Sequence, residues 1–118
     1  MNHDPEGRIT VTANPKRIRI LSGDTVIADT RNALELRETG YPDRQYIPRG
    51  DIAMQYLQRS DTVTHCPFKG DATYYSVVID GTTIADAAWS YEEPFEAMEK
   101  IRSHVAFASP RLLETAGE

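Results

Sequence analysis

The sequence predicts one mainly β domain, built of compact antiparallel sheets of hairpins with one C-terminal helix. Apolar and polar residues alternate along most of the first ninety positions, which is the period of half-buried strands. Two dipeptides, Gly23-Asp24 and Asp80-Gly81, stand between β-rich runs and indicate tight hairpin turns. Three glutamates around Pro94 mark the start of the one expected helix.

The chain has 118 residues, which suits a single domain. We expect a flexible N-terminal lead-in over residues 1–8, the β-rich domain over 9–108, and a C-terminal tail over 109–118. Strands are predicted in five early segments, namely Ile9–Thr12, Arg17–Ile20, Thr25–Ala28, Leu34–Leu36 and Tyr46–Ile47. Residues 51–58 fit either a strand or one helical turn.

The clearest local prediction is a hairpin whose strands flank Asp80-Gly81. A two-residue loop sets the register, pairing Ile79 with Thr82 and continuing to Tyr74 opposite Ala87. One face then carries the core side chains Tyr75, Val77, Ile79 and Ile84. The other face carries Tyr74 and Trp89 beside Ser76, Ala85 and Ala87.

The helix is expected to begin in the segment Ser90–Pro94, because proline and glutamates favour a helix N-terminus. Its buried stripe would consist of Phe95, Met98, Ile101 and Val105, which recur at helical spacing.

Composition excludes several classes of partner. The chain has 18 Asp and Glu against 13 Lys and Arg, so it lacks the positive charge that nucleic acids and acidic membranes require. One cysteine cannot form an internal disulfide, and no apolar run approaches the ~18 residues of a membrane span. We expect a cytoplasmic protein with no nucleic-acid or membrane partner.

The segment Thr64–Asp71 holds the residues most suited to chemistry. Cys66 is either a packed core residue or a reactive thiol helped by the nearby cation of Lys69. Lys69 itself is either a turn residue or a point charge for a carboxylate or phosphate. His65 is either a hydrogen-bonded structural residue or an acid/base group. Pro67 and Gly70 shape the turn around them.

Two acidic residues and two aromatic residues add to this set. Glu38 and Asp51 follow apolar segments, at strand ends that commonly converge on pockets. Trp89 and Tyr91 are either core residues or walls of a ligand site. A metal site is not expected, since a structural zinc needs four Cys or His ligands and His65 and Cys66 are adjacent. No cofactor motif is present either.

Five segments resemble those of the bacterial domain-of-unknown-function family numbered 427, in the same order and spacing over about residues 8–108. They are Arg17–Ile20, the Gly23–Asp29 hairpin, Tyr46–Asp51, Thr64–Gly70 and Ala88–Pro94. The resemblance implies a fold similar to the β-tent proteins, without the zinc that many of them hold. It also brings a nucleotidyltransferase label, which no nucleotide motif in this sequence supports.

Carried over by position, the family pattern points to the residues already singled out, namely Glu38, Asp51, His65, Cys66, Pro67, Lys69, Gly70, Trp89 and Tyr91. Relatives often have an aromatic residue at the position of Ala108, so one wall of the pocket is expected to be more open in this chain.

The sequence therefore predicts an unidentified small-molecule ligand in a pocket around residues 65–70 and Trp89. The predicted binding residues are Tyr74, Trp89, Tyr91 and Lys69. An enzymatic alternative is group transfer or hydrolysis, with Cys66 as nucleophile, Lys69 lowering its pKa, and Glu38, Asp51 or His65 as acid/base. A third alternative is an interaction module that docks a peptide on its aromatic face.

Overall fold

The computed structural model describes residues 8–117, and strands make up most of this span. The mainly β prediction is confirmed. The ten strands are β1 (Ile9–Asn14), β2 (Arg17–Ser22), β3 (Thr25–Thr30), β4 (Ala33–Glu38), β5 (Arg44–Pro48), β6 (Leu57–Cys66), β7 (Gly70–Ile79), β8 (Thr82–Ser90), β9 (His104–Phe107) and β10 (Leu113–Gly117). Three short 3-10 turns complete the fold, namely η1 (Arg49–Asp51), η2 (Met54–Tyr56) and η3 (Glu96–Ile101).

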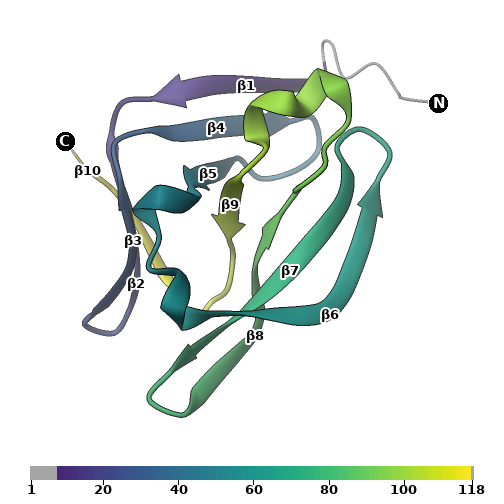
Figure 1. The fold of residues 1–118 in the computed structure, drawn as a ribbon. Coiled ribbons are helices and arrows are strands. Elements are labelled where there is room, and N and C mark those ends of the chain that lie inside the picture. The colour runs from purple at the N-terminus through teal and green to yellow at the C-terminus, as the bar shows by residue number, and fades with distance from the viewer. Residues whose placement is uncertain (1–7, 118) are drawn as a thin grey trace.

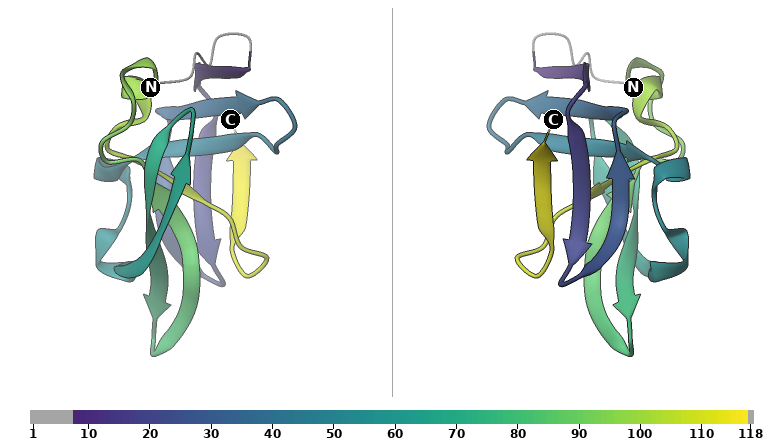
Figure 2. Two further views of the ribbon diagram at one scale, coloured as in Figure 1. Left: turned by 90° about the vertical axis from the view of Figure 1, so that its right-hand side faces the viewer. Right: turned by 90° about the vertical axis from the view of Figure 1, so that its left-hand side faces the viewer.

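The strands form two antiparallel sheets (Figure 1). The larger sheet has seven strands in the order β1-β4-β5-β9-β8-β7-β6, and the smaller has three in the order β10-β2-β3. A bridge between Ala28 and Ile52 connects β3 to the segment between η1 and η2. In both views of Figure 2, β10 (yellow) runs beside the other strands of the smaller sheet.

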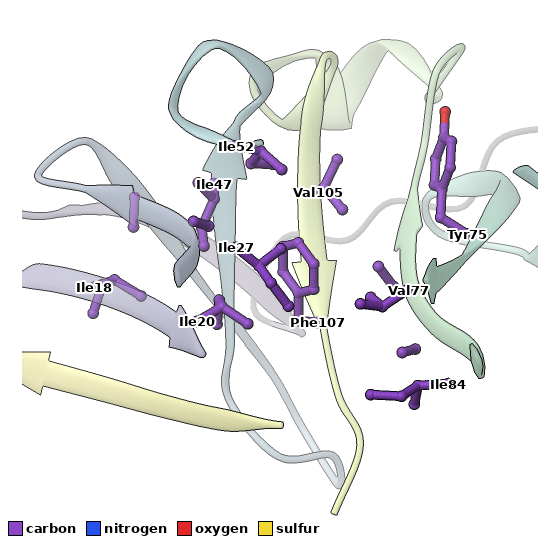
Figure 3. Close-up of a cluster of buried hydrophobic side chains, with 14 residues drawn as sticks. Ile18, Ile20, Ile27, Ile47, Ile52, Tyr75, Val77, Ile84, Val105 and Phe107 are labelled. Atoms are coloured by element: carbon purple, nitrogen blue, oxygen red, sulfur yellow. The ribbon is translucent and has the colours of Figure 1, made fainter. Parts of the chain in front are cut away.

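The main hydrophobic core lies between the two sheets (Figure 3). Ile27 from β3 and Phe107 from β9 lie next to each other at its centre, and Val77 and Ile84 approach from β7 and β8. Ile27 and Val77 are fully buried. The predicted core face of the hairpin is therefore confirmed, because Tyr75, Val77 and Ile84 all belong to this cluster.

The β7–β8 hairpin turns at Asp80-Gly81, as predicted, and both residues have the positive φ of a type I′ turn. The predicted register holds from Ile79–Thr82 to Val77–Ile84 and then shifts. Tyr75 pairs with Ala88 instead of Asp86. Between this pair and the Val77–Ile84 pair, β8 therefore contains two more residues than β7. Trp89 consequently lies directly opposite Tyr74, not opposite Ala72.

Asp86 sits in this irregular stretch, with a φ of 50°. Its carboxylate accepts hydrogen bonds from Ser60 Oγ at 2.6 Å and Thr62 Oγ1 at 2.7 Å, both from the irregular part of β6. Its backbone N–H donates to Ser76 Oγ at 3.2 Å. These bonds connect β6, β7 and β8 through one residue and stabilise the bulge at this position. Tyr74 and Trp89 share a face as predicted, but Ala87 belongs to the main core instead of lying beside them.

The predicted C-terminal helix is wrong. Strand β8 continues through Ser90, and only the 3-10 turns of η3 follow, with a non-helical Met98. Val105, expected on a helix, lies in β9 and pairs with Ile47. Tertiary pairing overrides local propensity here, because β9 fills the gap between β5 and β8. Met98 and Ile101 are nevertheless buried, as the helical stripe predicted.

The structure adds contacts at both ends of the described span. The C-terminal tail predicted over residues 109–118 contains β10, which pairs with β2 from Leu113 to Gly117. Of the predicted lead-in, residues 1–7 lie outside the described residues, while the Arg8 carbonyl accepts a hydrogen bond from the Thr39 N–H at 3.0 Å. No helix among residues 8–117 is long and apolar enough to cross a membrane.

Candidate ligand-binding site

A cavity of about 470 Å³ lies where β4, β5 and β8 meet the turn between β6 and β7. Seven of the eight residues predicted as catalytic or ligand-binding line it, namely Glu38, His65, Cys66, Lys69, Tyr74, Trp89 and Tyr91. The structure adds Leu36, Tyr41, Pro42, Arg44, Tyr46, Pro67 and Ala108. The lining thus comes from segments that are far apart in the sequence.

An ion pair between Lys69 and Glu38 forms the polar part of the cavity. Lys69 Nζ lies 2.7 Å from Glu38 Oε1, and each side chain is only 9% exposed. The same Nζ stands 5.7 Å from the centre of the Tyr91 ring. Arg8 approaches the other oxygen of Glu38, with Nε at 4.0 Å from Oε2. The pair connects β4 to the β6–β7 turn, two segments that do not pair in the sheet.

The segment just before η3 packs against the backbone at Lys69 and Gly70. The Phe95 N–H donates to the Lys69 carbonyl at 3.1 Å. Gly70 has a φ of +109°, and a Cβ there would stand 3.5–3.6 Å from the backbone of residues 93–95. Glycine is therefore required by the backbone conformation. This packing fixes the direction in which the Lys69 side chain leaves the turn.

Aromatic rings form the walls. Tyr74 and Trp89 are register partners, and their ring centres are 6.1 Å apart. The Trp89 indole N–H donates to the Tyr46 hydroxyl at 3.1 Å, and the Tyr46 and Tyr91 ring centres are 6.5 Å apart. The guanidinium carbon of Arg44 stands 5.4 Å from the centre of the Trp89 ring. Four aromatic side chains thus form a continuous surface.

The hydroxyl groups of Tyr46 and Tyr91 stay neutral over the physiological pH range. Burial raises the pKa of Tyr46, and the Trp89 hydrogen bond opposes this only in part. Burial also raises the pKa of Tyr91, helped by its neighbours Tyr46 and Cys66. Within residues 8–117, the Tyr46 hydroxyl hydrogen has no acceptor, although the residue is 1% exposed. A neutral hydroxyl of this kind is suited to donate a hydrogen bond to a ligand.

His65 lies at the mouth of the cavity. Its Nδ1 is 2.8 Å from Asp71 Oδ1, and its ring makes an edge contact with Phe95, with centres 6.2 Å apart. His65 and Asp71 are register partners on β6 and β7, so the hairpin itself brings them together. No local pattern in the sequence indicates this contact. The His65 side chain is 62% exposed, which makes it a rim residue.

Cys66 has features of both a packed core residue and a residue that faces the cavity. The thiol is free and half-buried, and the residue packs against the smaller hydrophobic cluster that contains Tyr46 and Tyr91. It also lines the cavity. Cys66 is therefore part of both the core and the pocket wall.

Asp51 is the one predicted site residue that the structure places elsewhere. It belongs to η1, and its Oδ2 accepts a hydrogen bond from Thr30 Oγ1 at 2.7 Å. It therefore secures the end of β3. Among residues 8–117, no three His, Cys, Asp or Glu side chains come together in a way that could hold a metal ion.

Sequence reasoning missed Arg44 and Tyr46 as site residues, although a signal existed. The two residues are two positions apart on β5, so they share a face. The sequence predicts Tyr46 only as a strand residue, and nothing in it distinguishes Arg44 from the solvated charges of other strands and loops. Only the pairing of β4 with β5 reveals that this face adjoins Glu38.

A second polar cluster supports the base of the site. Glu92 Oε2 accepts hydrogen bonds from the Tyr75 hydroxyl at 2.6 Å and from Ser90 Oγ at 3.3 Å. Arg49 Nη1 lies 3.5 Å from the same oxygen. These contacts hold the end of β8, from which Trp89 and Tyr91 project.

Glu92 is expected to make stability depend on pH. The Tyr75 hydrogen bond lowers the pKa of Glu92 below its ordinary 4.5, and burial opposes this in part. Because the pKa of Glu92 is lower in the folded than in the unfolded protein, its ionised carboxylate stabilises the folded state fully above about pH 4.5. This stabilisation is lost as the pH falls through the folded-state pKa. We expect Glu92→Gln to flatten this acid dependence in urea titrations. Glu96→Gln, at an exposed position, is the control, and an equal effect of both substitutions would contradict the prediction.

Comparison with known families gives one match. The family model described as "Domain of unknown function (DUF427)" matches residues 10–115, which is most of the chain. A comparison with curated proteins found no match. The chain belongs to the DUF427 family, which confirms the resemblance seen in the sequence.

Proposed function

We propose that this DUF427 chain is a small-molecule-binding domain and that its ligand occupies the cavity between Lys69 and Trp89. The observation that carries the proposal is the meeting of a buried ion pair and four aromatic rings in one cavity. A volume of about 470 Å³ lies within the range of small-molecule sites. Such sites combine apolar walls with a few polar groups, which is the composition found here.

The ion pair supports this proposal because it is expensive for the fold. Removing two charges from water costs several kcal/mol per ion, and well-packed apolar residues at such positions often stabilise a protein equally well. Lys69 and Glu38 line a cavity and are not enclosed by the main core. A polar function toward a ligand explains their presence better than stability does.

The walls indicate what kind of ligand is accommodated. Tyr74 and Trp89 provide a surface on which a flat ring can stack. The hydroxyls of Tyr46 and Tyr91, together with the ammonium of Lys69, offer hydrogen-bond donors in the cavity lining. A ligand with one flat ring and one acceptor-rich group matches both features.

Two further proposals concern the arrangement of the sheets and the cellular location of the protein. We propose that the antiparallel sheets are arranged as in β-tent proteins, which is supported by the antiparallel pairing of the ten strands in two sheets. A cytoplasmic location is supported by the single free cysteine.

The enzymatic alternative has one supporting observation, since Cys66 and His65 line the same cavity and His65 is paired with Asp71. That mechanism needs Lys69 to promote formation of the thiolate. Lys69 is instead engaged by Glu38 at 2.7 Å. Binding is therefore the better-supported function, and a rapid reaction of Cys66 with iodoacetamide at neutral pH would favour the enzyme instead.

A thermal-shift screen with a metabolite library tests the proposal. A ligand present at a hundred times its Kd stabilises the folded state by about 2.7 kcal/mol. We expect at least one compound to do so, and Tyr74→Ala to abolish its effect. Tyr56→Ala is the matched control, because Tyr56 belongs to η2 and does not line the cavity. Equal loss of the ligand effect in both variants would contradict the proposed site.

A further inference from the structure

Arg44 occupies an unusual position at one edge of the cavity. It lies on β5 and its guanidinium stands over the Trp89 ring, 5.4 Å from the centre. Within residues 8–117, this guanidinium makes no ion pair and no hydrogen bond. Lys69, the other cation of the cavity, is in contrast paired with Glu38.

No carboxylate among residues 8–117 forms an ion pair with Arg44. Asp43, its chain neighbour, lies 3.6 Å from Arg37 Nε and belongs to that pair. Glu114 borders the same hollow as Arg44 and interacts with it through space, without an ion pair at contact distance. One planar guanidinium without a partner is suited to one carboxylate, which it can bind through two parallel hydrogen bonds.

Arg44 also borders a second hollow of about 240 Å³. Arg44 and Ala108 line both hollows, so the two spaces meet at these residues. The side chain of Ala108 is a single methyl group, and its backbone is held by a hydrogen bond from its N–H to the Ala87 carbonyl at 2.9 Å. Apolar side chains from Ile20, Phe107 and Leu112 line the second hollow, and Ser109 and Glu114 add two polar groups at its wall.

We propose that the ligand is an aromatic carboxylic acid whose acid-bearing carbon also carries an apolar chain. The ring stacks against Tyr74 and Trp89, the carboxylate binds Arg44, and the chain passes Ala108 into the second hollow. N-acyl aromatic amino acids have this arrangement of groups. This inference rests on the proposed function and specifies its ligand class. It makes Arg44 the anchor for the acid and Ala108 the residue that determines chain length.

Three probes test the inference by isothermal titration calorimetry, namely N-hexanoyl-L-phenylalanine, its neutral methylamide and N-acetyl-L-phenylalanine. We expect the hexanoyl acid to bind roughly tenfold more tightly than its amide, because charge-assisted hydrogen bonds are the stronger kind. It should also bind roughly tenfold more tightly than the acetyl compound, because its chain buries additional methylene groups. If the acid and the amide bind with equal affinity, or if the hexanoyl and acetyl compounds do, the inference is overturned. This comparison uses the unmodified protein alone.

Two substitutions assign these preferences to residues. Arg44→Gln is expected to remove the preference for acid over amide, and Ala108→Leu to remove the preference for the longer chain. Arg111→Gln is the matched control, since Arg111 lines a separate hollow beside Val77 and Ile84 and should change neither preference. Preferences that survive both site substitutions would overturn the assignment.

The test also separates this inference from the proposed function. If none of the probes binds while the metabolite screen finds a ligand that depends on Tyr74, the ligand class is wrong and the binding function stands. If the screen finds no stabilising compound and no probe binds, both are wrong.

Discussion

Lys69→Met is expected to lower the free energy of unfolding by about 3 kcal/mol, at the lower end of the range for breaking a buried ion pair. Methionine preserves most of the side-chain volume but leaves the Glu38 carboxylate buried at 9% exposure without its partner. Arg8 Nε, at 4.0 Å from Glu38, offsets part of the loss. Urea denaturation followed by circular dichroism measures the change.

The double variant Glu38→Leu/Lys69→Met is the control for this effect. Replacing both charges removes the unpaired carboxylate, so most of the lost stability should return. A double-mutant cycle then shows strong coupling between the two positions. Purely additive losses would show that the ion pair does not act as a unit.

Ile47→Ala is expected to cost about 3 kcal/mol, within the range for truncating a buried isoleucine. Ile47 is fully buried and pairs with Val105, so it connects β5 to β9 at the centre of the larger sheet (Figure 3). The loss combines the transfer free energy of the missing groups with the cavity they leave.

Val63→Ala is the matched control, because Val63 is 62% exposed on the edge strand β6. It should change stability by no more than about 0.5 kcal/mol. Similar losses at both positions would contradict the assignment of Ile47 to the core.

The sequence was most informative where structure depends on neighbouring residues. The turn at Asp80-Gly81 follows from the φ preferences of two residues, and the core face of β7 follows from alternation. The register failed beyond Val77, because Asp86 forms hydrogen bonds with β6, a strand more than twenty residues earlier. Contacts of this kind leave no local pattern.

The missed strand β9 has the same cause. His104–Phe107 is only four residues long and follows a segment with good helical signals. Its conformation depends on pairing with β5 and β8, and that pairing is visible only once the sheet is assembled.

The residues singled out for the candidate site come from several parts of the sequence. His65, Cys66, Lys69 and Trp89 line one cavity, and their role toward a ligand stays a prediction. Glu38 was selected from its place at a strand end, and the structure supplies its partner, Lys69. The same argument chose Asp51, which instead bonds to Thr30, because the end of a strand does not specify which face a side chain takes.

The indole N–H resonance of Trp89 offers the most direct test of the central claim, since Trp89 is the only tryptophan and lines the cavity. Its hydrogen bond to the Tyr46 hydroxyl makes the signal sensitive to changes at both walls. In a ¹H–¹⁵N NMR titration with a stabilising compound from the screen, we expect this resonance to shift and saturate with the Kd found by calorimetry. A compound that stabilises the protein without moving the Trp89 resonance would contradict the account.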